Sequence, residues 1–198
     1  MSRKFMERVL TPKVRQAEEA AYGRAFAAPV GAPPDALGAD ERAFIAARDS
    51  FYMATVTEDG WPYVQHRGGP KGFLKVLDAH TLAFADLGGN RQLVTVGNLD
   101  GDGRVALFLM DYAQQVRLKI LGRAKVHDLR SATGDSLGLP LPPRTERLVT
   151  IDVEGYDWNC PQHITPRYDA EAVAEALAPL KARIAELEAR LGQGPGPA

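Results

Sequence analysis

The sequence predicts a mainly β domain, an antiparallel barrel or sandwich, with helices toward both ends of the chain. From Phe51 onward, short apolar runs follow one another and are separated by turn residues. The first four runs lie too close together to leave room for the crossover helices of a parallel sheet. Hydrophobic residues make up 45% of the 198 residues, which is enough for one real core.

Residues 1–49 predict an N-terminal extension of helices and loops. Thr11 and Pro12 form a favourable helix start, because a hydroxyl N-cap precedes proline at the first helical position. Residues 27–38 are rich in Ala, Pro and Gly and predict a loop. A short helix is expected over residues 40–48, with Asp40 as its cap.

The strands are expected where apolar and β-branched residues gather between turns. Residues 93–99 fit either a strand, by propensity, or a crossover helix. Residues 131–143 predict a loop or a short helix, because Gly138 and three prolines break the segment. The predicted strands are 51–57, 61–67, 73–77, 81–86, 104–110, 116–127 and 147–153.

The tail predicts a helix over residues 169–191, followed by frayed residues 192–198. Pro179 interrupts this helix and should bend it or cost hydrogen bonding. Two roles stay open: a seam for a partner helix, or a helix that packs on its own barrel. Apolar residues recur four and three positions apart, as in a heptad seam, at Val173, Leu177, Leu180, Ile184, Leu187 and Leu191.

Composition narrows the class of protein. The net charge of −1 gives no bulk attraction to nucleic acid or to anionic membranes. The single cysteine, Cys160, rules out an intrachain disulfide and fits a reducing compartment. No apolar run reaches transmembrane length, so we expect a soluble cytoplasmic protein without membrane or nucleic-acid partners.

Walker, GxGxxG and GxSxG motifs are missing, which disfavours kinases, Rossmann dehydrogenases and α/β-hydrolases.

Two glycine-rich turns, 68–72 and 88–91, carry basic residues and predict a phosphate site. Glycine lets backbone N–H groups approach phosphate oxygens, and arginine supplies a bidentate fork. Arg67, Lys71 and Arg91 are therefore a candidate phosphate clamp. The alternative is that each is a solvated surface charge beside a turn.

The strand that leads into the first turn strengthens the prediction for Arg67. Side chains alternate across a strand, so Tyr63, Gln65 and Arg67 should share one face. Val64 and His66 should share the other face, where His66 is expected to be a neutral, hydrogen-bonded histidine. A polar face beside a glycine turn is a better ligand site than an isolated arginine.

Residues 156–164 form an unusual segment after the last predicted strand. It holds an indole, amides, a thiol and an imidazole next to proline, and such a loop can lie against a planar aromatic ligand. Alternatively, Trp158 fills the core. No neighbouring His–acid pattern favours Cys160 as a nucleophile, and no histidine has metal-ligand spacing with another His or with Cys160, so no metal site is expected.

Three motifs together resemble the pyridoxamine 5′-phosphate oxidase-like, FMN-binding split-barrel family, and in particular its flavin-nucleotide-binding branch. The first is DGWPYVQHRGGPKGF at 59–73. The second combines GNR at 89–91 with GNL at 97–99, and the third combines NCPQHI at 159–164 with PRY at 166–168. The resemblance covers residues 50–168.

The resemblance implies a six-stranded antiparallel split barrel with flanking helices, working as a homodimer with FMN at the subunit interface. It also favours a helix at 93–99. The first two motifs would serve the ribityl chain and phosphate, and the third would reach the isoalloxazine from the partner subunit. The implied cofactor-binding residues are Gln65, His66, Arg67, Gly68, Lys71, Phe73, Asn90, Arg91, Gln92, Asn98, Trp158, Asn159, Gln162 and His163.

These expectations predict an FMN-dependent oxidoreductase of unassigned substrate, served by a small-molecule electron donor. The arginine-rich substrate site of pyridoxamine phosphate oxidases is missing near the C-terminus, so vitamin B6 oxidation is not assigned. His66 or His163 could relay a proton, but no catalytic residue is evident. A non-catalytic flavin carrier or redox sensor is the alternative, and haem or a deazaflavin the alternative ligands. The expected domains are 1–49, 50–168 and 169–198.

Overall fold

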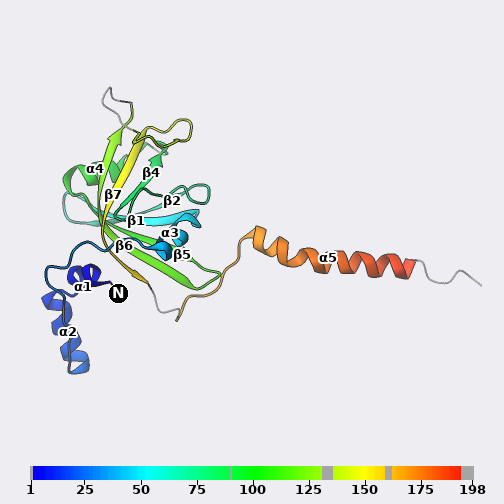
Figure 1. The fold of residues 1–198 in the computed structure, drawn as a ribbon, viewed down its shortest axis with the longest axis horizontal. Helices are drawn as coiled ribbons and strands as arrows, with labels where there is room; N and C mark the ends of the chain where they lie inside the picture. The colour runs from blue at the N-terminus through cyan, green and yellow to red at the C-terminus, as the bar shows by residue number, and fades with distance from the viewer. Residues whose placement is uncertain (1, 90, 131–135, 159–161, 193–198) are drawn as a thin grey trace, which may run out of the picture.

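The protein is built around one antiparallel sheet, shown in a computed structural model that describes residues 2–89, 91–130, 136–158 and 162–192 (Figure 1). The helices are α1 Arg3–Val9, α2 Pro12–Tyr22, α3 Ala39–Ala46, α4 Val94–Gly101 and α5 Ala170–Gly192. The strands are β1 Ser50–Val56, β2 Pro62–Gly68, β3 Lys75–Val76, β4 Thr81–Asp86, β5 Arg104–Asp111, β6 Val116–Asp128 and β7 Arg147–Trp158.

The sheet curls into a barrel. Its strand order is β2-β1-β5-β6-β7-β4-β3, and every pairing is antiparallel. Although β2 and β4 lie near opposite ends of this order, an ion pair between Arg67 and Asp86 joins them. Phe51 of β1 also meets Phe84 of β4, with ring centroids 5.4 Å apart. The predicted antiparallel barrel is confirmed, although it has seven strands rather than six. The additional strand is the short β3, which has only two residues.

The barrel interior is an apolar core formed by alternate residues of the strands. In β1, Phe51 and Met53 are buried while Tyr52 between them is exposed. In β5, Leu107 and Leu109 point inward in the same way. This alternation is the period-two pattern of a strand with one face in the core, and it leaves the other face of β1 and β5 outside the barrel.

Helix α1 packs closely on β7, and a glycine makes this possible. A Cβ at Gly155 would lie 2.6 Å from the backbone nitrogen of Phe5, closer than real contacts allow. The hydroxyl of Ser2 donates to the backbone oxygen of Tyr156 at 2.6 Å, and the Asp35 carboxylate accepts the N–H of Phe5 at 3.3 Å. The N-terminal extension is thereby attached to the barrel.

The predicted start of α2 is confirmed, whereas the cap of α3 differs. The Thr11 hydroxyl accepts the N–H of Val14 at 3.3 Å, with Pro12 at the start of α2. Helix α3 begins after Gly38, whose N–H donates to the Glu41 carboxylate at 2.9 Å. The prediction of Asp40 as cap was wrong, because Asp40 lies inside the first turn.

Two segment boundaries also correct the sequence predictions. Residues 156–158 were expected in a loop, but they extend β7 because they pair with β6, where Trp158 lies opposite Leu118. The predicted strand at 73–77 shrinks to the two residues of β3. Residues 93–99 resolve in favour of the helix, since α4 buries Thr95 and Leu99, one turn apart, against the barrel.

Helix α5 confirms the predicted C-terminal helix but does not pack on the barrel. It extends away from the sheet (Figure 1), and none of its residues is buried. The hypothesis that α5 packs on its own barrel was therefore wrong for this chain. None of the described helices is long and apolar enough to cross a lipid bilayer.

Candidate functional site

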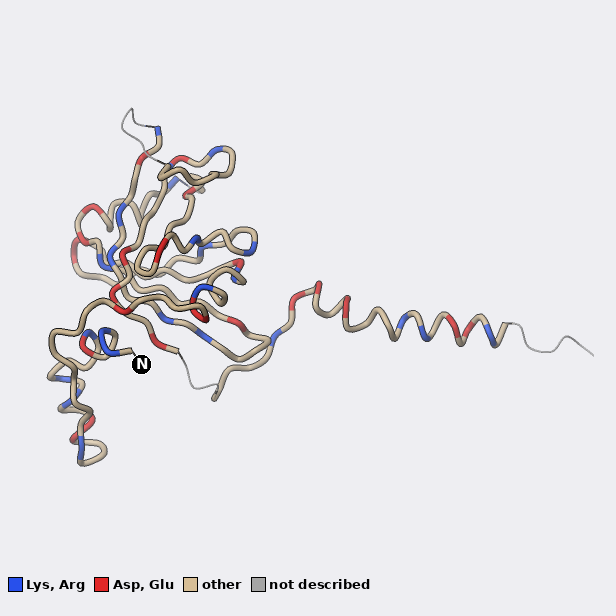
Figure 2. The backbone as a smooth tube through the Cα atoms, in the orientation of Figure 1, with Lys and Arg blue, Asp and Glu red and all other residues tan. Residues whose placement is uncertain are grey.

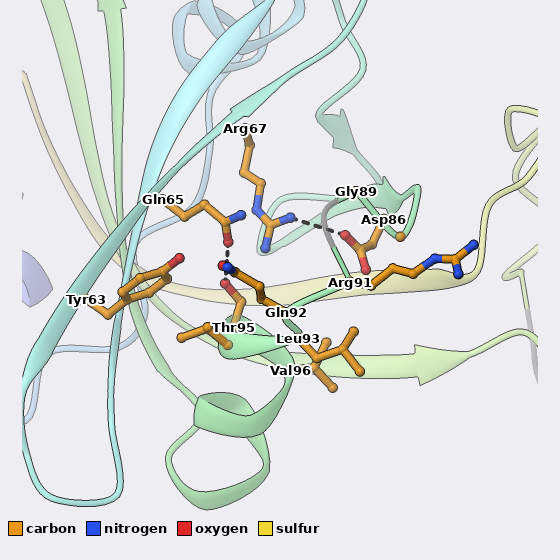
Figure 3. A pocket seen from close by; sticks show the side chains of 12 residues that line it. Tyr63, Gln65, Arg67, Asp86, Gly89, Arg91, Gln92, Leu93, Thr95 and Val96 are labelled. Atoms are coloured by element: carbon orange, nitrogen blue, oxygen red, sulfur yellow. Dashed lines mark hydrogen bonds and ion pairs between the residues drawn. The ribbon is translucent and has the colours of Figure 1, made fainter.

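A small polar cavity lies where β2, the end of β4 and the start of α4 meet (Figure 3). Its volume is about 50 Å³, which suits a group the size of phosphate rather than a ring system. We call it the β2–α4 cavity. It is lined by Tyr63, Gln65, Arg67, Asp86, Gly88, Gly89, Arg91, Gln92, Leu93, Val94, Thr95 and Val96.

Strand β2 presents three of these side chains together. Tyr63, Gln65 and Arg67 are half-buried, whereas Val64 and His66 between them are exposed. This is the alternation expected from the sequence. The register with β1 places Gln65 opposite Met53 and Arg67 opposite Phe51, so the polar side chains lie over the open side of the core.

Arg67 is the most constrained cation of the cavity. Its Nη1 donates to Oδ1 of Asp86 at 3.1 Å, and its guanidinium lies over the ring of Phe84 at 5.6 Å. Its Nε is buried and has no hydrogen-bond partner among the described residues. A buried donor without a partner is costly. The Nε–H group therefore has an unused hydrogen-bonding capacity in a residue that lines the cavity.

Two side-chain hydrogen bonds attach α4 to the neighbouring strands. The Thr95 hydroxyl donates to Oε1 of Gln65 at 2.8 Å. Asn98 donates through Nδ2 to the buried Thr55 hydroxyl, also at 2.8 Å. Asn98 therefore supports the cavity from behind and does not line it, while the first residues of α4 do. The N–H groups of a first helical turn have no intrahelical acceptor and favour anions.

The loop between β4 and α4 has a strongly left-handed backbone. Gly88 has φ 75°, Arg91 has φ 61° and Leu93 has φ 56°. The φ of Gly88 favours glycine, and a Cβ there would lie 2.7 Å from the Glu146 carboxylate, which would have to move. The exposed Arg91 side chain extends away from Arg67 (Figure 3), so one arginine of the predicted clamp points in and the other points out.

Asp86 is the acidic centre of the cavity wall. Its two carboxylate oxygens each accept a guanidinium N–H at 3.1 Å, one from Arg67 and one from Arg147. Arg147 is buried and pairs also with Glu146 at 3.0 Å. The network holds Arg67 in place and neutralises part of its charge, so an anionic ligand would share Arg67 with Asp86.

Other predicted residues lie outside this cavity. Gly68, Lys71 and Phe73 line a second, mainly apolar cavity of about 170 Å³, together with Leu139 and Leu141. The Lys71 side chain therefore does not join Arg67 in one clamp within this chain.

His66 lies on the outer face of β2, where its ring meets the edge of Tyr52 with centroids 5.6 Å apart. The structure thus places His66 opposite the β2–α4 cavity, on the face predicted for it.

The third motif and the neighbouring Trp158 lie in different surroundings. Trp158 donates its indole N–H to Oε1 of Glu41 at 2.7 Å and packs edge-to-face on Phe44 at 4.9 Å. Gln162 and His163 are exposed and line no cavity given above. Asn90 and Asn159 lie outside the described residues, as does Cys160. Within one chain, the described residues of this motif therefore do not line the β2–α4 cavity.

Sequence reasoning missed Asp86 and Thr95, and left Tyr63 out of the ligand set. Thr95 has a readable signal, because it is a polar residue on the buried side of α4, and a buried polar group needs a hydrogen-bond partner. Asp86 has no such signal, because its partners Arg67 and Arg147 lie far from it in the sequence. Among the described residues, no group of His, Cys, Asp and Glu is arranged to hold a metal ion.

Comparisons with known proteins found similar solved structures and one matching family profile. No curated protein matches the chain. A Lactobacillus delbrueckii structure described as a candidate pyridoxamine 5′-phosphate oxidase has 21% identity and a TM-score of 0.49, over 62% of this chain and 93% of that chain. HupZ from Group A Streptococcus has 14% identity and a TM-score of 0.47, over 66% and 99%. An FMN-binding protein from Syntrophomonas wolfei has 13% identity and a TM-score of 0.41, over 60% and 83%.

The family assignment comes from a separate match to a sequence profile. The sequence profile described as Pyridoxamine 5′-phosphate oxidase matches residues 37–137, just over half of the chain. This range includes β1 to β6, the glycine-rich loop before α4 and every residue that lines the β2–α4 cavity. The protein belongs to the pyridoxamine 5′-phosphate oxidase family.

Proposed function

We propose that this protein binds FMN and serves as an FMN-dependent oxidoreductase, with the phosphate of the cofactor in the β2–α4 cavity. The observation that carries the proposal is the buried Nε of Arg67, a charged donor without a partner in a cavity of phosphate size. Charge-assisted bonds from guanidinium to phosphate are among the stronger hydrogen bonds in proteins. FMN has the acceptor that this group lacks.

The other walls of the cavity also suit a phosphate. Gly88 and Gly89 let the backbone approach closely, and the start of α4 presents N–H groups. Arg91 lies at the rim, where another conformation of its exposed side chain would bring a second positive charge to the ligand. The isoalloxazine is too large for this volume, so it would lie outside the cavity, along β2 and toward a second subunit.

When bound, FMN would supply the redox chemistry, and the protein would fix its position and exposure. Arg67 and Arg91 would hold the phosphate, while Gln65 and Gln92 would lie beside the ribityl chain. The substrate and the electron donor are small molecules in this proposal. Residues 50–168 would carry the binding function, and residues 1–49 and 169–198 would be accessory. We also propose a cytoplasmic location, and the net charge of −1 disfavours a nucleic-acid partner.

A homodimer forms part of the proposal, because the outer sheet face is apolar. Tyr52 is 42% exposed and Val64 is 60% exposed, and both line a shallow outer cavity of about 400 Å³ with Phe108 and Met110. We call this surface the outer apolar face. Exposed apolar clusters of this kind typically mark a protein interface. A second copy that covers the face would also bring its own third motif toward the cofactor.

Absorbance of the purified protein is the first test, before and after titration with FMN. Flavin bands that bleach with NADPH under anaerobic conditions support an oxidoreductase. Bound flavin that NADPH and NADH leave oxidised favours the carrier or sensor hypothesis instead. A Soret band or a deazaflavin spectrum would replace FMN by another ligand.

Riboflavin lacks the phosphate and therefore tests the site itself. Wild-type protein should bind FMN more tightly than riboflavin, and Arg67→Lys should reduce this preference by about 1–3 kcal/mol, because lysine keeps the charge but has no Nε–H donor. Arg91→Ala should act in the same direction, and its exposed position leaves folding intact. Arg123→Ala, at another exposed arginine, is the matched control. An unchanged preference in both site variants would refute the phosphate position.

A further inference from the structure

Helix α5 carries a continuous apolar row that the described chain leaves uncovered. Its residues are between 41% and 81% exposed, although they are large aliphatic side chains. Charged residues of both signs are interspersed along the rest of the helix (Figure 2). We call this row the α5 seam: Val173, Leu177, Leu180, Ile184, Leu187 and Leu191.

A lone helix of this kind is only marginally stable in water. Most helical stability in proteins comes from packing of an apolar face, and α5 has no buried residue. Pro179 removes one backbone donor within the helix and weakens it further. The α5 seam therefore needs a cover, and the barrel of the same chain does not provide one.

The spacing of the α5 seam is that of a two-stranded coiled coil. Steps of four and three residues place Leu177, Ile184 and Leu191 at the first core position of the heptad. Leu180 and Leu187 then occupy the second core position. An Ile at the first position flanked by Leu at the second favours two strands over three or four.

We propose that the α5 seam pairs in parallel with the α5 seam of a second copy of this chain. In a parallel pair, Arg183 at the position before Ile184 faces Glu188 of the second copy, and the symmetric pair forms too. An antiparallel pair that overlaps the whole seam would set Lys181 and Arg183 opposite their own counterparts, although Lys181 would also meet Glu188. Only the parallel pair forms opposite-charge contacts without like-charge ones.

The start of α5 borders the outer apolar face. Gln115 at the β5–β6 turn donates to the backbone oxygen of Ile164 at 2.5 Å, and the Arg167 guanidinium lies over the ring of Tyr112 at 4.9 Å. Tyr112 itself lines the outer cavity. A dimer on this face therefore brings both α5 starts to one interface, as a parallel pair requires.

The pairing rests on the proposed homodimer, because the part of the seam beyond Pro179 spans only residues 180–191. Two heptads associate weakly alone, but subunits already held together raise the effective concentration of each helix to the millimolar range. The α5 pair would then strengthen the dimer, and it would become helical mainly within it.

The test compares two doubly substituted full-length chains of equal charge. Leu180→Glu with Leu187→Glu breaks the seam, whereas Ala182→Glu with Ala189→Glu places the same charges on the opposite side of α5. Sedimentation across a dilution series should show the dimer dissociation constant rise about tenfold or more in the seam variant and stay unchanged in the control. Far-UV circular dichroism should lose helical signal only in the seam variant. Equal dissociation constants in the two variants would overturn the proposal.

A cross-link reports the direction of pairing. In a Cys160→Ser background, Leu191→Cys should form an intermolecular disulfide readily, since parallel helices bring the two positions together. An antiparallel pair would separate them by about 27 Å and instead cross-link Leu191→Cys chains to Val173→Cys chains. That result would refute the parallel arrangement. FMN affinity, measured at protein concentrations high enough to keep the variants dimeric, stays unchanged, so loss of pairing is distinguishable from failure of the proposed FMN site.

Discussion

Arg67 and Asp86 form an ion pair, Nη1 to Oδ1 at 3.1 Å, between two strands that are not neighbours in the sheet. The pair joins β2 to β4 and at the same time forms one wall of the β2–α4 cavity. Barrel closure and the proposed binding of phosphate thus depend on the same guanidinium. The Asp86 carboxylate competes with any anion that enters the cavity for the charge of Arg67.

Asp86→Asn should therefore separate stability from anion affinity. Loss of the carboxylate leaves Arg67 and the buried Arg147 with weaker partners, so the free energy of unfolding should fall by about 1–3 kcal/mol. Affinity for inorganic phosphate should rise, because a negative charge beside the site has been removed. Urea denaturation and phosphate titration measure the two effects. Asp128→Asn, in an exposed pair with Arg130, is the control for stability. Weaker phosphate binding in Asp86→Asn would contradict the competition.

Trp158→Phe tests which of two roles the indole has. The substitution removes the hydrogen bond to the buried Glu41 carboxylate, which should lower the free energy of unfolding by about 1–2 kcal/mol. Because Trp158 packs on Phe44 in this chain, we expect the absorbance of bound flavin to stay the same. A shifted flavin band in the folded variant would instead support the partner-subunit contact implied by the sequence resemblance.

Gly155→Ala should destabilise the contact between α1 and β7. The added methyl would sit 2.6 Å from the backbone nitrogen of Phe5, so α1 must move, at a cost of about 1–3 kcal/mol. Gly97→Ala in α4 is the contrasting control, because nothing lies within 4 Å of its Cβ position. That variant should be neutral or stabilised by about 0.5–1 kcal/mol. Thermal unfolding measures the stability of both variants, and an equal change in stability would contradict the close approach at Gly155.

Tyr156 should make stability fall in alkaline solution. Burial raises the pKa of its hydroxyl, and the nearby Glu41 carboxylate adds to the rise. In the unfolded chain this pKa is about 10, so the stabilising contribution is complete below pH 10 and is lost as the pH rises through the folded pKa. Tyr156→Phe should reduce this alkaline decline, whereas Tyr168→Phe, at an exposed site, should not. Denaturation at pH 9 to 11 measures the decline in stability, and an equal decline in wild type and Tyr156→Phe would show that Tyr156 is not its cause.

Val64→Glu tests the outer apolar face. The side chain is 60% exposed, so the monomer should fold normally. A charge in the interface should raise the dimer dissociation constant by about tenfold or more, since a charge without a partner would be buried. Val14→Glu on α2, also at an exposed apolar residue, is the control. Sedimentation across a dilution series measures the dimer dissociation constant of both variants, and a wild-type protein that is monomeric at all concentrations would rule out the homodimer.

Local patterns were sufficient for most elements of this fold. The Thr11 cap, the alternation along β2 and the C-terminal helix each depend on neighbouring residues only, and each prediction is confirmed. The prediction for the cap of α3 failed because two neighbouring acidic residues compete, and Glu41 rather than Asp40 accepts the N–H of Gly38. Sequence alone does not rank such competitors.

The site was harder to predict because it depends on closure of the barrel. The sequence identified Gln65, Arg67 and Arg91 from strand alternation and turn chemistry, and all line the cavity. It did not reveal that Asp86 pairs with Arg67, nor that Lys71 faces a different cavity. These outcomes follow from the order of strands in the sheet, which no local pattern encodes. FMN itself stays a prediction.

The period of β2 has a consequence for insertions and deletions. Its residues serve two surfaces in strict alternation, with Gln65 and Arg67 facing the cavity and Val64 and His66 facing outward. One extra residue in the turn at 57–61 would shift the register with β1 by one position and exchange the two surfaces. Such a change would remove the proposed ligand binding and the proposed subunit contact in a single step, so we expect the length of this turn to be more constrained than its composition.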